Sequence, residues 1–121
     1  MDGNAKRGKA ETYIKDDHEL MLQVGRALFR EGLIGPAHRF FDLAASAHPD
    51  SSDAAACLGY AAHRLGNDAG SLYWLRRALE LDAGFTEARI YLANLLYDRG
   101  EYEAALTSYR LDLRDGSVTT V

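Results

Sequence analysis

Apolar residues recur three and four positions apart along most of the chain, and glycine interrupts the pattern at regular intervals. Such spacing places the apolar side chains on one face of an α-helix. The pattern predicts six helices joined by short turns, at residues 18–31, 36–47, 52–65, 69–81, 86–99 and 102–112. The chain has only two prolines and many Ala, Leu, Arg and Glu residues, and this composition also favours helix over sheet. We therefore expect an all-α fold.

The interrupting glycines are Gly32, Gly66 and Gly100, which stand 34 residues apart. Laid on itself at this period, the chain gives three rows that align without a gap and begin at His18, Ser52 and Thr86. Each row has an apolar then a small residue at positions seven and eight, a small residue at twenty and a large apolar one at twenty-four. A period of this length is the signature of stacked structural repeats.

The turn chemistry agrees with two helices per row. Each of the three glycines is expected to close a first helix in the left-handed conformation, where a Cβ atom is penalised. Gly35-Pro36 fits the start of a second helix, because proline is tolerated in the first turn. Side-chain caps for the first helices are expected from Asp17, from Ser51 or Ser52, and from Thr86.

The three aligned rows resemble the tetratricopeptide repeat, whose unit is a pair of antiparallel helices. The resemblance covers residues 18–113 and implies an α-α superhelix of three units, at 18–51, 52–85 and 86–119 by register. Segments 1–17 and 114–121 are expected to be flexible tails. The family commonly ends its stack with a capping helix, and none is visible in the sequence after the third unit.

The missing cap leads to a specific expectation, because each unit of a solenoid buries its face on the next. An uncapped last hairpin leaves apolar residues bare, namely Leu106, Tyr109, Leu111 and Leu113. Either the chain is a piece of a longer protein, or another chain covers these residues. The second alternative includes a homodimer formed through the terminal hairpin.

The resemblance implies that the first helix of each unit lines a concave groove. Positions two, five, nine, twelve and thirteen share that face of the helix. Position five supplies Leu22, Ala56 and Ile90, and the candidates for binding a peptide are Arg26, Phe29, Arg30, Tyr60, His63, Arg64, Asn94 and Tyr97. Aromatic rings give contact area at low entropic cost and guanidinium groups bind carboxylates, so an acidic segment of a protein partner is expected.

One subset of the family holds the C-terminal carboxylate of heat-shock chaperones with lysine and asparagine at positions five and nine. Here only Asn94 has a matching residue type, in the third row. That form of recognition is therefore disfavoured.

Composition excludes several other classes of function. The net charge of -4 argues against nucleic acid as the main partner, and no apolar run is long enough to cross a membrane. The four histidines are scattered without ligand spacing, so neither a metal site nor a cofactor is expected. The single cysteine, Cys57, is expected to be a buried thiol in a reducing, cytoplasmic setting.

Three classes of function follow. The first is a non-enzymatic adaptor or scaffold that recognises a protein segment in its groove. The second is a self-associating or secretion-chaperone-like element that dimerises through the uncapped hairpin. The third, an enzyme, is disfavoured because no nucleophile–base pair, phosphate loop or metal cluster is evident in the sequence.

Overall fold

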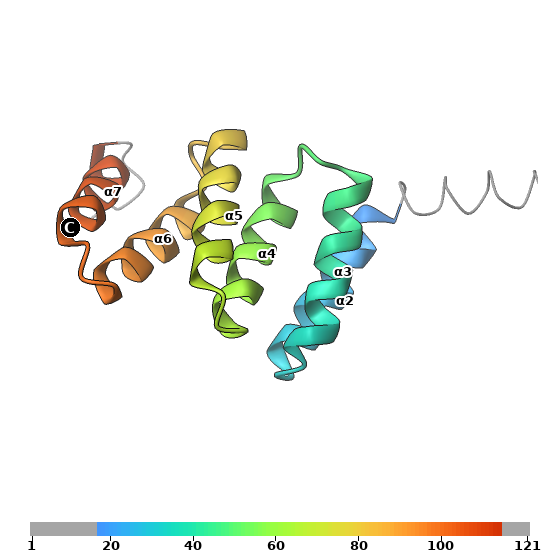
Figure 1. The fold of residues 1–121 in the computed structure, drawn as a ribbon. Helices are drawn as coiled ribbons and strands as arrows, with labels where there is room; N and C mark the ends of the chain where they lie inside the picture. Colours follow the sequence, from blue (N-terminus) through green and yellow to red (C-terminus); the bar gives the residue numbers. More distant parts are fainter. Residues whose placement is uncertain (1–16, 115–121) are drawn as a thin grey trace, which may run out of the picture.

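The computed structural model describes residues 17–114, with side chains as far as Arg110, and shows six α-helices and no strand in this range (Figure 1). The helices are α2 (His18–Arg30), α3 (Ile34–Ala47), α4 (Ser52–Arg64), α5 (Asp68–Leu81), α6 (Thr86–Asp98) and α7 (Tyr102–Arg114). The predicted all-α fold and the six predicted helices are confirmed, with ends that differ by one or two residues. The two predicted tails, apart from Asp17 and Arg114, lie outside the described residues.

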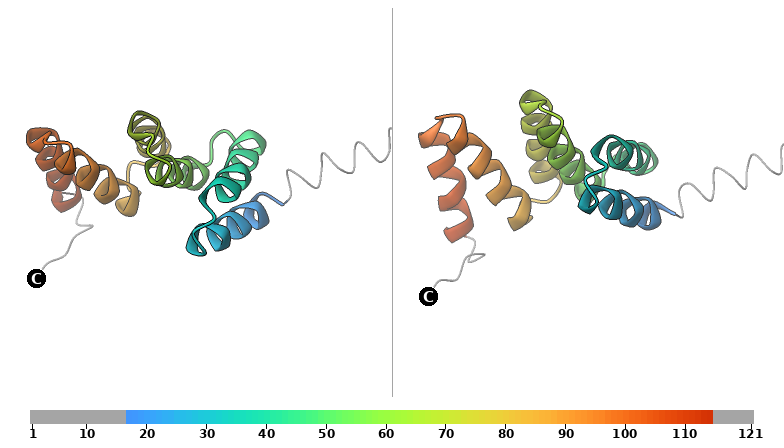
Figure 2. Two further views of the ribbon diagram at one scale, coloured as in Figure 1. Left: turned by 60° about the horizontal axis from the view of Figure 1, so that its bottom comes forward. Right: turned by 90° about the horizontal axis from the view of Figure 1, so that it is seen from below.

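Consecutive helices pair as three hairpins, α2 with α3, α4 with α5, and α6 with α7 (Figure 1). The hairpins follow one another along the molecule, so that α3 packs against α4 and α5 against α6. Two further views show the same succession, with the first hairpin at one end and the third at the other (Figure 2). The arrangement is a short helical solenoid.

The turn inside each hairpin depends on its glycine. Gly32, Gly66 and Gly100 all have φ of 82°, and they are the described residues with a positive φ. Beyond the first of these, the backbone N–H of Leu33 donates to the carbonyl of Leu28 at 2.9 Å, which satisfies a carbonyl at the helix end. The predicted role of the three glycines is confirmed.

The predicted helix caps are correct at only one of three hairpins. Ser51 accepts a hydrogen bond from the backbone N–H of Ala54 at 3.1 Å and so caps α4. Asp17 makes no cap bond, because its backbone (φ -97°, ψ 21°) is not in the extended conformation that caps favour. Thr86 is wrong as a cap because it is already the first helical residue, and Phe85 holds the cap position.

Side chains of neighbouring hairpins form two buried clusters. One joins the first and second hairpins and contains Leu22, Ala37, Phe41, Ala44, Ala54, Cys57, Leu58 and Ala61. The other joins the second and third and contains Ala55, Ala56, Leu75, Ala78, Ala88, Leu92, Leu95, Leu96 and Ala105. Trp74 is partly buried and packs against both clusters. The core therefore runs along the solenoid, and alanines let the helices approach closely.

The two glycines at position eight lie where paired helices touch. A Cβ atom on Gly25 would stand 2.5 Å from Cε1 of Phe41, and one on Gly59 would stand 2.8 Å from Cγ of Leu75. Real Cβ atoms do not approach carbon this closely, so a larger residue requires the helices to move apart. In the third hairpin the same position is Ala93, which is fully buried.

Candidate binding groove

A hollow of about 400 Å³ lies between the first helices of the hairpins. We call it the central hollow, and its lining residues are Arg26, Phe29, Arg30, Phe41, Asp53, Ala56, Cys57, Tyr60, Phe85 and Glu87. They come from α2, α3, α4 and the start of α6, including the turn before it. All three hairpins therefore contribute, and the hollow exists only when they are stacked.

The floor of the central hollow is apolar and buried, with contributions from Phe41, Ala56 and Cys57. Burial raises the pKa of the Cys57 thiol from 9.0 to about 11, and the neighbouring Arg26 charge opposes this only in part. The thiol is thus protonated at neutral pH and behaves as a small apolar group. The predicted buried thiol is confirmed.

Tyr60 is held in place by contacts to the third hairpin. Its hydroxyl donates to Glu87 Oε1 at 3.0 Å, and its ring lies 4.6 Å from the ring of Tyr91, centroid to centroid. Burial, followed by the negative charge of Glu87, raises the pKa of Tyr60 well above its usual value. The phenol therefore keeps its proton, and the pair links α4 to α6 along the hollow.

The arginines near the hollow differ in their partners. Arg26 lies 4.0 Å from Glu19, while the Arg64 guanidinium lies 5.2 Å from the centroid of the Phe29 ring. Arg64 does not itself line the hollow, but it covers a ring that does. Arg30 lines the hollow and makes no hydrogen bond or ion pair with any residue that the structure describes.

The other candidate groove residues lie elsewhere. His63 Nδ1 is 3.1 Å from Asp68 Oδ1, and its ring packs on Tyr91 at the junction of the second and third hairpins. Asn94 accepts a hydrogen bond from the Tyr109 hydroxyl, which ties α6 to α7. Tyr97 belongs to a separate hollow described below. Leu22, expected on the groove face, is completely buried in the core.

Three residues of the central hollow lie outside the positions that were predicted to face the groove. Phe41 lies on a second helix and reaches the hollow because Gly25 leaves space for its ring. Cys57 was assigned to the core, and it is both buried and part of the floor. Phe85 precedes α6, outside the helix stripe from which the candidates were read.

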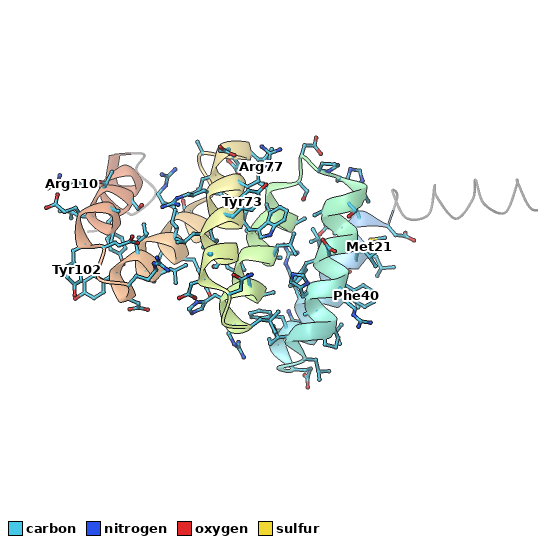
Figure 3. The ribbon with its side chains drawn as sticks, in the orientation of Figure 1. Met21, Phe40, Tyr73, Arg77, Tyr102 and Arg110 are labelled. Carbon is cyan, nitrogen blue, oxygen red and sulfur yellow. The ribbon has the colours of Figure 1, made fainter. Side chains whose placement is uncertain are left out.

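A second hollow, of about 420 Å³, lies on the third hairpin. We call it the terminal hollow, and it is lined by Tyr97, Tyr102, Ala105, Leu106 and Tyr109. The rings of Tyr97 and Tyr102 contact each other edge to face, with their centroids 5.1 Å apart. Tyr102 lies at the end of the described part of the molecule that the third hairpin forms (Figure 3). Leu106 is exposed, as expected for an uncapped hairpin. Tyr109 is not bare, because it is partly buried and packs against the cluster that joins the second and third hairpins. The side chains of Leu111 and Leu113 lie outside the described part.

Within the described residues, no three His, Cys, Asp or Glu side chains gather where they could hold a metal ion. None of the described helices is both long and apolar enough to cross a membrane.

Comparison with known proteins gives no match to a protein-family model and none to a curated protein sequence. Solved structures match well. The P58(IPK) TPR domain superposes with a TM-score of 0.76 at 26% identity over 81% of this chain. The second TPR of Spaghetti (RPAP3), bound to the HSP90 peptide SRMEEVD, superposes with a TM-score of 0.77 at 16% identity, over 87% of this chain and 96% of that one. The three hairpins have the tetratricopeptide-repeat fold.

The predicted repeat fold is therefore confirmed. A further tetratricopeptide-like match is the Yersinia enterocolitica type III secretion translocator chaperone SycD, in an alternative dimer. Its TM-score is 0.78 at 17% identity, over 84% of this chain and 77% of that one. The present chain spans only 27% of the P58(IPK) structure, so its three hairpins correspond to one part of that longer structure.

Proposed function

We propose that this chain is a non-catalytic interaction module that binds a segment of a protein partner in the central hollow. The observation that carries the proposal is the lining itself: an apolar floor bordered by arginines and carboxylates, assembled from all three hairpins. A hollow of about 400 Å³ is within the range of sites that hold small ligands or single large side chains. A cytoplasmic location is part of the proposal, because the buried Cys57 is a free thiol.

The partner segment is proposed to carry an acidic side chain. Arg30 is exposed, has no partner among the described residues and lines the hollow, so its guanidinium group is available to a carboxylate. The RPAP3 structure, which has the same fold, holds an acidic HSP90 peptide. The lysine and asparagine pattern of the chaperone-binding subset is absent here, so the proposal rests on Arg30 and its neighbours.

The test is selection of binding peptides from a random peptide library, followed by titration of the selected peptides. A double variant, Arg30→Glu with Tyr60→Ala, should weaken binding at least about tenfold, since it reverses a charge and removes an aromatic contact. The matched control is Tyr73→Ala with Arg77→Glu, two residues of α5 (Figure 3). This helix supplies none of the residues that line the central hollow. If the groove variant keeps wild-type affinity for every selected peptide, the proposal is wrong.

The terminal hollow favours a second function, self-association through the third hairpin. Tyr97, Tyr102 and Leu106 are 58%, 61% and 49% exposed and lie together, which is unusual for apolar side chains on a free surface. A second copy with the same patch would bury them symmetrically. SycD, a structural neighbour, is described as a dimer.

Light scattering across a dilution series tests this second function. Leu106→Glu should raise the dimer dissociation constant at least about tenfold, because it places a charge in the apolar patch. Leu43→Glu on α3 is the matched control, since Leu43 is 48% exposed and lies outside the hollow. A wild-type chain that remains monomeric at every concentration would exclude self-association.

A further inference from the structure

The charges around the central hollow are divided between its walls. Arg26 and Arg30 both come from α2, whereas Asp53 comes from α4 and Glu87 from the first turn of α6. The hollow therefore has two positive and two negative groups at its border, and the two signs stand on different helices. A purely acidic segment would meet attraction from one wall and repulsion from the other.

The four charged groups are not equally available. Arg26 lies near Glu19 and beside the Cys57 thiol, and Glu87 accepts the hydroxyl of Tyr60. Arg30 and Asp53 are both exposed, and neither makes a hydrogen bond or ion pair within the described part of the chain. Among the described residues, one unpaired cation on α2 and one unpaired anion on α4 thus border the same apolar floor.

An extended peptide can satisfy this arrangement. Alternate side chains of an extended chain point the same way, and they are spaced about 7 Å apart. Three alternate residues can therefore place a charged side chain on each wall with an apolar side chain between them. That central side chain would contact the apolar floor formed by Phe41 and Ala56.

From this geometry, and resting on the proposed function, we infer that the central hollow selects a segment of mixed charge. The segment has an acidic side chain against Arg30, a bulky apolar side chain on the floor, and a basic side chain against Asp53 and Glu87. We call this requirement for one acidic and one basic side chain the charge rule. It does not fix the chain direction of the peptide, so the acidic side chain can come before or after the basic one.

The experiment uses capped seven-residue peptides with serine at the odd positions and three chosen residues at the even ones. The set is Asp-Leu-Lys, Lys-Leu-Asp, Asp-Leu-Asp and Lys-Leu-Lys, titrated by fluorescence anisotropy at low salt. At least one mixed peptide should bind the wild type about fivefold more tightly than either like-charged peptide, the size expected for one exposed ion pair gained.

Charge reversal on each wall gives the matched variants. Asp53→Lys should make the doubly acidic peptide the preferred ligand, and Arg30→Glu should make the doubly basic one preferred. Both positions are exposed and unpaired among the described residues, so both variants should keep the fold. Arg30 stands in the last turn of α2 and Asp53 in the first turn of α4, so each reversal opposes a helix dipole and should lower the melting temperature slightly.

The outcomes separate this inference from the proposed function. Equal wild-type binding of the doubly acidic and mixed peptides overturns the charge rule, and so does a preference that survives both reversals. If the random library yields ligands that depend on Tyr60 but share no mixed-charge pattern, only the charge rule fails. If neither the library nor the four peptides bind, the groove itself is not a peptide site and both proposals fall.

Discussion

The central and terminal hollows are nearly equal in volume, yet they are built in different ways. The central hollow combines residues of three hairpins and has charged groups of both signs at its border. The described lining of the terminal hollow comes from α6 and α7 alone, and consists of three tyrosines, an alanine and a leucine. The first can discriminate ligands by charge, whereas the second can offer mainly apolar area. Similar size therefore does not imply similar binding.

The largest expected effect comes from breaking the close approach of helices beneath the central hollow. Gly59→Leu should lower the free energy of unfolding by about 3 kcal/mol, because α4 and α5 must separate to admit the side chain. Since α4 supplies Asp53, Ala56, Cys57 and Tyr60, peptide binding should be lost as well. Urea unfolding followed by circular dichroism gives the stability, with Gly59→Ala as a graded comparison. A leucine variant as stable as wild type would contradict the packing described for this hairpin.

The second effect concerns the buried thiol, a group absent from the described lining of the terminal hollow. Unfolded Cys57 loses its proton near its ordinary pKa of 9.0, whereas the folded thiol keeps it up to about 11. This group therefore leaves the free energy of unfolding unchanged below pH 9. Between pH 9 and 11 the unfolded thiol ionises and the folded one does not, so the free energy of unfolding decreases by about 2.5 kcal/mol in total.

Unfolding midpoints measured from pH 7 to 11 would reveal this decrease. Tyr60 acts in the same direction, but only above its ordinary pKa of 10.0. Cys57→Ala should therefore remove the part of the decrease that begins near pH 9 and leave the part that begins near pH 10. An unchanged profile in the alanine variant would show that the thiol is not protected by burial.

The smallest expected effect is a difference between the two hollows in how their binding depends on salt concentration. Raising NaCl from 0.05 to 0.5 M shortens the screening length from about 14 to about 4 Å. Affinity of the central hollow for a mixed-charge peptide should decrease about fivefold, since its selectivity depends on exposed charges. Self-association through Tyr97, Tyr102 and Leu106 should change by less than about twofold. Equal salt sensitivity of both processes would remove the distinction between the hollows.

The sequence predicted the helices, the turn glycines and the stacking, because these depend on a period repeated three times. The individual caps were less predictable, since the roles of Asp17 and Thr86 depend on backbone angles at single residues. In the groove, Arg26, Phe29, Arg30 and Tyr60 were placed together as the helix stripe suggested.

His63 and Asn94 do not line the central hollow, because their side chains turn toward neighbouring helices to satisfy hydrogen bonds. A single-helix pattern contains no information on how far successive hairpins rotate. That rotation decides which residues of the stripe face the hollow, and it also brings in Phe85 from a turn.

Trp74 has a practical consequence for studying this molecule. It is the only tryptophan in the chain, and it touches the cluster beneath the first junction as well as the cluster beneath the second. Its fluorescence emission spectrum should therefore change when either the first or the third hairpin separates from the second. The protein thus contains its own optical reporter of partial unfolding, without any attached dye.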